Sequence, residues 1–225
     1  RKGEAGIPAF LEDYAFFIYG LLELYEATFE AKYLVIALEL NAFLRRHFLD
    51  EEKGGFFQLS TQSEEVLVRK KEVYDGALPS GNSVMALNLL RLSRLTGDNS
   101  FQEEAQRILK AFSALVLTSP TNYTQFLSAL DFALGPSQEI VIVGQRGEET
   151  TERMLAMAQE RFIPDKVILF RAVDEESPEI TKVAPFTSDL TAIDGKTTAY
   201  VCQNYQCAAP TCDPERLLQL LAGEV

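Results

Sequence analysis

An internal repeat of 68 residues constrains the fold of this chain more than any other feature. Shifting the sequence by 68 positions lays residues 18–38 over residues 86–106. The apolar residues that then coincide are Leu21, Leu22, Leu24, Tyr33 and Ala37 with Leu89, Leu90, Leu92, Phe101 and Ala105. In each unit, apolar residues recur every three or four positions on both sides of a tight turn, which predicts a helix, a turn and a second helix.

A third unit begins at residues 122–134 and stops at Gly135–Pro136. We therefore expect residues 1–135 to form stacked antiparallel helical hairpins. Such hairpins cannot bury their inner faces alone, so they stack into a solenoid or close into a toroid. Two and a half hairpins make a short stack. We expect the stack to be completed by a missing N-terminal part of the same protein or by a second copy.

The connection between the first two hairpins is long, covering residues 50–79. It contains the runs GGFFQLS and EVLVRKKEVY, which are rich in residues that favour strands. This pattern predicts a short β-ribbon within the connection. Connections of this length are uncommon in compact domains and are often functional.

The apolar period changes after Pro136, and residues 136–225 are expected to form a small α/β appendage. The predicted elements are a strand at Glu139–Gln145, a helix at Glu148–Phe162, a strand at Lys166–Arg171, a third strand at Thr197–Cys207 and a closing helix at Asp213–Leu221. The order strand, helix, strand predicts that the first two strands are parallel. Asp213 is the expected N-cap of the closing helix. The predicted fold class is mainly α, with partly parallel strands at the end.

Charge and cysteine content narrow the possible partners and the compartment. A net charge of -12 opposes binding to nucleic acid and to anionic membranes. Neither is expected as a partner, and no apolar run is long enough to cross a bilayer. The three cysteines, Cys202, Cys207 and Cys212, cannot all pair with one another. This suits a reducing compartment and predicts a cytoplasmic protein.

The same residues argue against a metal or cofactor site. The spacing Cys-x4-Cys-x4-Cys differs from the Cys-x2-Cys pairs of zinc sites. His47 is the only histidine, so a multi-histidine site cannot be built within the chain. We therefore predict no metal ion and no cofactor.

The most unusual stretch is YDGALPSGN, residues 74–82, which precedes the second hairpin. Asp13 lies near the start of the first inner helix, and its counterpart across the repeat is Gly81 at the start of the next. Neighbouring packed helices lie about 8 to 10 Å apart, so polar groups at both starts can share one rim. The candidate site consists of Asp13 and Asp75 as catalytic carboxylates, with Tyr14, Tyr74, Ser80 and Asn82 as ligand-binding residues.

A purely structural interpretation accounts for the same residues one at a time. Ser80 is a good helix N-cap, and Asp75-Gly76 is a common turn dipeptide. Asp13 in the first turn of a helix complements the helix dipole. Structural roles explain the clustering of these residues on one rim less well.

Three segments resemble the C-terminal portion of the spermatogenesis-associated protein twenty family. They are LEDYAF at residues 11–16, YDGALPSGNSVMALNLLRLSRLTGD at 74–98 and AYVCQNYQCAAPTCDPERL at 199–217. In that family a thioredoxin-like domain precedes a helical toroid similar to N-acylglucosamine 2-epimerases and six-hairpin glycosidases. The resemblance thus implies an incomplete (α/α) toroid here, with the thioredoxin-like domain outside this chain.

Two classes of function follow. As an enzyme, the chain would be sugar isomerase-like or glycosidase-like, with Asp13 and Asp75 as acid and base on a polyhydroxylated ligand. The similar epimerases use histidine pairs, and a single histidine departs from that pattern. The alternative is a non-catalytic binding or scaffold module that works with the thioredoxin-like domain.

Overall fold

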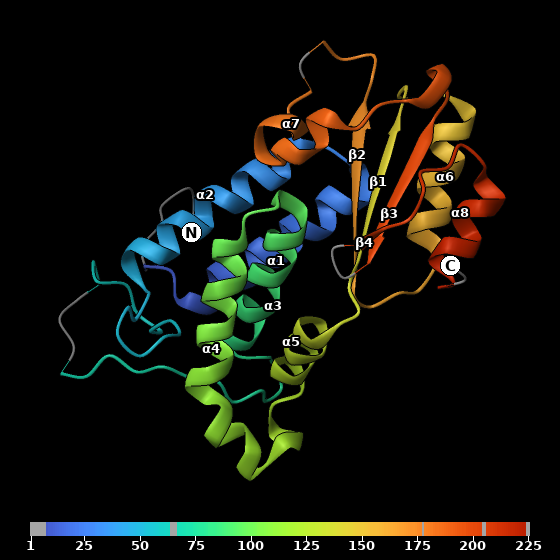
Figure 1. Ribbon diagram of the computed structural model, residues 1–225. Helices are drawn as coiled ribbons and strands as arrows, with labels where there is room; N and C mark the ends of the chain where they lie inside the picture. Colours follow the sequence, from blue (N-terminus) through green and yellow to red (C-terminus); the bar gives the residue numbers. More distant parts are fainter. Residues whose placement is uncertain (1–7, 64–66, 177, 204–205, 224–225) are drawn as a thin grey trace.

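The computed structural model describes residues 8–63, 67–176, 178–203 and 206–223, and its first part consists of helical hairpins (Figure 1). The helices are α1 (Leu11–Thr28), α2 (Ala31–His47), α3 (Gly81–Thr96), α4 (Asn99–Thr118) and α5 (Thr124–Leu134), with a 3-10 turn η1 (Pro120–Asn122) before α5. α1 packs against α2 and α3 against α4, while α1 and α5 both pack on α3. The inner helices therefore run in the order α1, α3, α5. The predicted incomplete (α/α) toroid of hairpins is confirmed.

The two complete hairpins repeat each other down to single hydrogen bonds. Thr28 Oγ1 donates to the carbonyl of Leu24 at 2.7 Å, and Thr96 Oγ1 donates to the carbonyl of Leu92 at 2.7 Å. The next residue adopts left-handed backbone angles in both turns, with φ of 55° at Phe29 and 76° at Gly97. The 68-residue offset is thus a true structural repeat.

The β-ribbon expected within residues 50–79 is wrong for the described part of that connection. The described part has an isolated bridge between Leu49 and Phe56 and a hydrogen bond of 2.9 Å from the Gln58 amide to the Lys70 carbonyl, but the pairing does not extend into strands. Side chains bind other backbone carbonyls of this region. Arg69 donates to the carbonyls of His47 and Leu59, and Lys71 donates to that of Gly54. Residues with strand propensity therefore lie in an irregular segment, whose backbone is bound by the side chains of Arg69 and Lys71.

The second part of the chain is a four-stranded sheet of order β2-β1-β3-β4. Its strands are β1 (Gln138–Gly144), β2 (Lys166–Ala172), β3 (Thr198–Gln203) and β4 (Gln206–Cys207). α6 (Glu149–Glu160) joins β1 to β2; α7 (Ile180–Val183) and the 3-10 turns η2 (Pro185–Asp189) and η3 (Ile193–Gly195) lie between β2 and β3; α8 (Pro214–Leu221) follows β4. β1 and β2 are parallel, as predicted, and β1 and β3 are antiparallel. Asp213 Oδ1 accepts from the Glu215 amide at 3.0 Å, so the predicted N-cap is also confirmed.

The expected single strand at 197–207 is instead two antiparallel strands, whose connecting residues 204 and 205 lie outside the described part. Cys202 faces Cys207 in this pairing, and the two form a disulfide. Cys212 is free, with its sulfur 3.4 Å from Thr198 Oγ1. The spacing of the cysteines did not predict this disulfide, and a cytoplasmic location stays a prediction.

The sheet shares its hydrophobic core with the hairpins. Val141, Val143, Val167 and Leu169 pack into the same cluster as the buried residues of α1 and α3. The alternate residues of β1 and β2 face α6 and α8, which cover the other side of the sheet (Figure 1). The sheet is therefore packed on the hairpins, while the division of the chain at residue 135 stays a prediction. Among the described residues, none of the helices has both the length and the apolar content that crossing a membrane requires.

The turn between α3 and α4 allows a direct test of this packing. A Cβ at Gly97 would be strained by the left-handed backbone and would lie 3.1 Å from the ring of Phe186. We expect Gly97→Ala to lower the free energy of unfolding by about 1 to 2 kcal/mol in urea titrations.

Gly195 supplies the matched control. It has a similar φ of 71°, but an added Cβ would meet no atom within 4 Å. Gly195→Ala should therefore lower the free energy of unfolding by less than Gly97→Ala does. Equal costs would show that Phe186 does not pack against the turn.

Candidate ligand-binding site

Asp75 is buried and both of its carboxylate oxygens accept hydrogen bonds from backbone amides. Oδ1 accepts from Ser80 at 2.9 Å, and Oδ2 accepts from Phe126 at 3.0 Å. The amide of Asp75 also donates to the carbonyl of Asn122 at 3.0 Å. Ser80 precedes α3 and Phe126 lies in the first turn of α5. Asp75 therefore ties the starts of two inner helices together.

Asn82 and Ser80 are likewise engaged within the protein. Asn82 has no exposed surface; its Oδ1 accepts from the Phe56 amide at 2.7 Å, and its Nδ2 donates to the carbonyls of Phe56 and Glu72. Ser80 Oγ accepts from the Ser83 amide at 3.1 Å and caps α3. These partners hold the long connection against the start of α3. For Asp75, Ser80 and Asn82, the geometry favours the structural interpretation.

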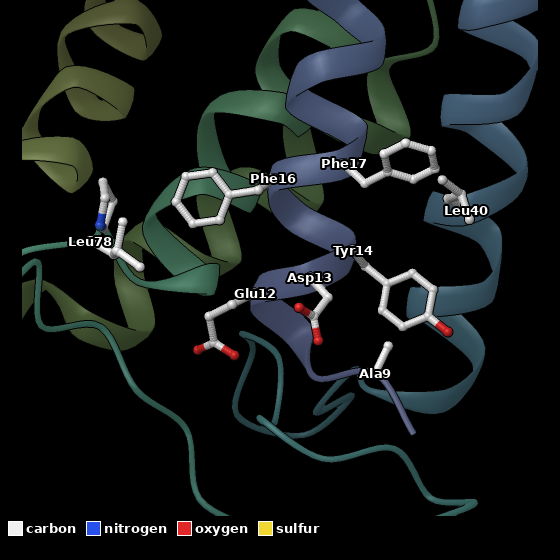
Figure 2. Close-up of a pocket in the computed structure, with 9 residues that line it drawn as sticks. Ala9, Glu12, Asp13, Tyr14, Phe16, Phe17, Leu40 and Leu78 are labelled. Atoms are coloured by element: carbon white, nitrogen blue, oxygen red, sulfur yellow. The ribbon is translucent and has the colours of Figure 1, made fainter. Parts of the chain in front are cut away.

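An open groove of about 790 Å³ lies at the start of α1 (Figure 2). It is lined by Ala9, Glu12, Asp13, Tyr14, Phe16, Phe17, Leu40, Leu78 and Pro79. Asp13 and Tyr14 are the two predicted site residues that line it. Tyr74 is exposed outside the groove, where its ring meets that of Tyr123 edge to face at 6.4 Å. The groove thus contains two of the six candidates.

The groove runs around the exposed side of α1. Figure 2 shows Glu12 and Phe16 on the side that faces Leu78, and Tyr14 and Phe17 on the side that faces Leu40 of α2. A carboxylate and a ring therefore lie on one side of the helix and two rings on the other.

Hydrogen bonding and ring packing fix two of these side chains. Asp13 Oδ2 accepts from the Phe10 amide at 2.8 Å and so caps α1. The Tyr14 ring stacks on Phe43 with centroids 5.3 Å apart and meets Phe48 edge to face. Asp13 combines a capping role with a place in the groove.

Glu12, Phe16 and Phe17 line the groove but were not predicted. The only signal for them in the sequence was the pair of consecutive phenylalanines beside the apolar stripe of α1. No cluster of three or more His, Cys, Asp or Glu that could hold a metal ion occurs in the described ranges. The expectation of no metal and no cofactor stays a prediction.

Comparison with known proteins places the chain in a family. No family model matches it. It is 37% identical over 213 residues to human spermatogenesis-associated protein 20, a match that covers 94% of this chain and 27% of the human protein. The chain belongs to the spermatogenesis-associated protein 20 family. The rat member is 36% identical over the same length. The chain spans about a quarter of the length of these family members, 27% in each case.

Among solved structures, a GH76 α-mannanase from Bacteroides thetaiotaomicron is 18% identical, with a TM-score of 0.42. The superposition covers 49% of this chain and 30% of the mannanase. A likeness this weak supports no inference about this chain.

The structural role of Asp75 makes a prediction about stability. An asparagine has one acceptor oxygen, so in Asp75→Asn either the Ser80 or the Phe126 amide would face an NH2 group. We expect the variant to lose about 1 to 3 kcal/mol of unfolding free energy in urea titrations.

Asp13→Asn is the control, because the side chain is exposed and its remaining carbonyl oxygen can still accept from Phe10. Its stability should stay within about 0.5 kcal/mol of the wild type. An Asp75→Asn protein as stable as the wild type would contradict the bracing role.

Proposed function

We propose that the groove at the start of α1 binds a polyhydroxylated ligand of carbohydrate type. The observation that carries this proposal is the placement of Glu12 and Asp13 beside the rings of Tyr14 and Phe16 in one open groove. Small-molecule sites are mostly apolar surfaces with a few polar groups that fix orientation. A sugar can lay its C–H face on an aromatic ring while its hydroxyls donate to the carboxylates.

The geometry favours binding over hydrolysis by Asp13 and Asp75. Glycosidases need two carboxyl groups on either side of one bond, about 5 to 9.5 Å apart. Both oxygens of Asp75 are occupied by backbone amides in a buried position. Glu12 and Asp13 are consecutive on a helix, so they point about 100° apart around its axis. Neither pair is arranged to act as acid and base on one glycosidic bond.

The second candidate function is a non-catalytic scaffold module. It is favoured by the exposed rings of Phe16 and Phe17, because exposed apolar side chains on one helix face also suit packing against another protein segment. Ligand binding depends on the Glu12 carboxylate, which packing against a protein segment does not need, so a change at Glu12 separates the two candidates.

Titration of the chain with a panel of neutral oligosaccharides, read by saturation-transfer NMR, tests the binding proposal. We expect Glu12→Gln to weaken binding by about 10-fold or more, since hydrogen bonds to a charged group contribute about 1.5 to 3 kcal/mol.

Tyr74→Phe is the matched control, because Tyr74 is an exposed aromatic residue outside the groove. It should bind as the wild type does. If no member of the panel binds, or if Glu12→Gln binds as tightly as the control, the proposal is wrong.

A further inference from the structure

The Cys202–Cys207 disulfide lies at the open edge of the sheet. The strand order is β2-β1-β3-β4, so β4 has β3 on one side and, in the described part of the sheet, no strand on the other. Cys207 is exposed and Cys202 is half-buried. Exposed disulfides are the ones that thiols reduce readily, whereas well-shielded structural ones resist reduction.

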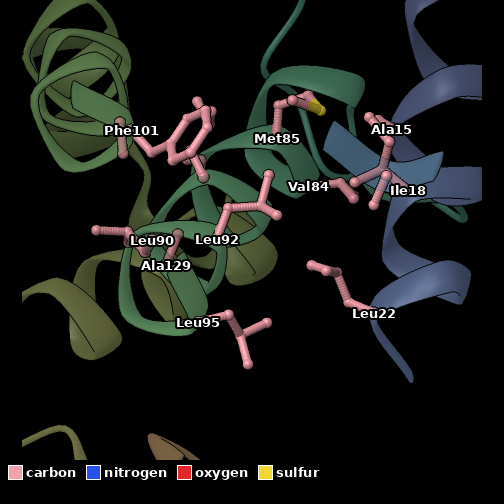
Figure 3. Close-up of a cluster of buried hydrophobic side chains, with 14 of the residues drawn as sticks. Ala15, Ile18, Leu22, Val84, Met85, Leu90, Leu92, Leu95, Phe101 and Ala129 are labelled. Carbon is pink, nitrogen blue, oxygen red and sulfur yellow. The ribbon is translucent and has the colours of Figure 1, made fainter. Parts of the chain in front are cut away.

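The disulfide contributes little to holding the fold together. It links residues only five positions apart, and cross-links that close short loops restrict the unfolded chain least. The fold rests on two buried apolar clusters, the larger of which is shown in part in Figure 3, and neither cysteine is among their described members.

Backbone hydrogen bonds hold the segment that follows β4. The Ala208 amide donates to the Val201 carbonyl at 3.0 Å, and Ala199 and Thr211 exchange two further bonds of 2.8 and 3.0 Å. The path from β4 to α8 therefore stays attached to β3 when the disulfide is opened.

The strand register determines which sulfur an incoming thiolate can attack. Glu139 of β1 lies opposite Cys202, and Cys202 lies opposite Cys207. Residues directly opposite one another point to the same face, so these three side chains form one row that ends at the open edge. A thiolate attacks a disulfide along the S–S axis, from the side away from the sulfur that leaves. The path to Cys207 therefore comes from the open edge, whereas the path to Cys202 comes from the side of Glu139.

The charges around the disulfide permit the approach of an anionic thiolate. Glu139 is paired with Arg94 of α3 at 3.2 Å, so its negative charge is balanced. The other cross-strand pair of the β3–β4 ladder, Gln203 and Gln206, is uncharged.

The remaining cysteine of the chain is too far away to reduce the disulfide. The sulfur of Cys212 lies 3.4 Å from Thr198 Oγ1 and donates to the carbonyl of Ile193 at 3.9 Å. Thr198 precedes Cys202 by four residues on β3, which is a separation of about 13 Å along an extended strand. In the folded chain the electrons must therefore come from another molecule.

We infer that Cys202–Cys207 is a redox-active disulfide that takes two electrons from an external dithiol. One thiolate of the dithiol bonds to Cys207 Sγ, the Cys202–Cys207 bond breaks, and its electron pair goes to Cys202 Sγ, which takes up a proton. The second thiolate of the dithiol then attacks the dithiol's own sulfur in the mixed disulfide. This step releases Cys207, which takes up the second proton, and leaves the dithiol oxidised to a disulfide. The inference does not rest on the ligand proposed for the groove.

A thioredoxin, kept reduced by its reductase and NADPH, serves as the dithiol probe for the fully oxidised chain. We expect about one NADPH to be consumed per chain, because the couple transfers two electrons. Cys212→Ser is the matched control and should consume the same amount, while Cys207→Ser should consume none. A thioredoxin that lacks its second cysteine should be trapped in a mixed disulfide, which peptide mapping should place on Cys207.

Reduction of the wild-type chain by dithiothreitol should be at most about tenfold slower in the folded chain than in urea, and the reduced chain should still unfold cooperatively on heating. The inference is overturned if the chain forms no disulfide, if it consumes no NADPH, or if the thioredoxin is trapped on Cys202. Reduction that is slower than this limit in the folded chain, or loss of cooperative unfolding after reduction, would show a structural disulfide and would also overturn it.

Discussion

The positions of the other helices depend on the close contact between the first turns of α1 and α3. Gly81 has no side chain, and Leu11 fills the space that a Cβ would need. Farther along the same interface, Asn88 binds the α1 backbone and Arg91 lies between Glu23 and Glu26. Burial alone would lower the pKa of Arg91, but the charges of Glu26 and Glu23 raise it above its usual value. The interface therefore combines close backbone packing with a cation held between two carboxylates.

The polar stretch before α3 serves this interface. Asp75 ties α3 to α5, Ser80 caps α3, and Asn82 anchors the long connection beside it. With the start of α3 held in this way, the contact with Leu11 places the first turns of α1 at the edge of the molecule. Asp13 is then exposed and Glu12 half-buried in the groove, which is where a ligand can reach them.

Local and periodic features of the fold could be predicted from the sequence, and long-range ones could not. The hairpins follow from apolar spacing and the repeat, the parallel strands from the order strand, helix, strand, and the Asp213 cap from its place just before the closing helix. The β-ribbon was expected from local propensity, but side chains far away in sequence bind that backbone; Asn82 lies 26 residues from Phe56. The Cys202–Cys207 disulfide depends on the pairing of two short strands.

Some residues of the candidate site could likewise be predicted from the sequence, and others could not. Asp13 and Tyr14 could be placed at a helix start because the repeat gives the position of that start. Carboxylates and hydroxyls that cap helices are the same residue types that bind ligands, so Asp75 and Ser80 could not be assigned from the sequence. The exposure of Phe16 and Phe17 depends on which helices cover α1, and this is known only from the packing.

The stability of Gly81→Ala tests the central claim most directly, because the two possible outcomes differ in sign. Alanine is a better helix former than glycine by up to about 1 kcal/mol, so an uncrowded position would gain stability. If α1 and α3 approach as closely as described, the added methyl group displaces Leu11, and the free energy of unfolding in urea should fall by about 1 to 2 kcal/mol. An unchanged or higher free energy of unfolding would contradict the account.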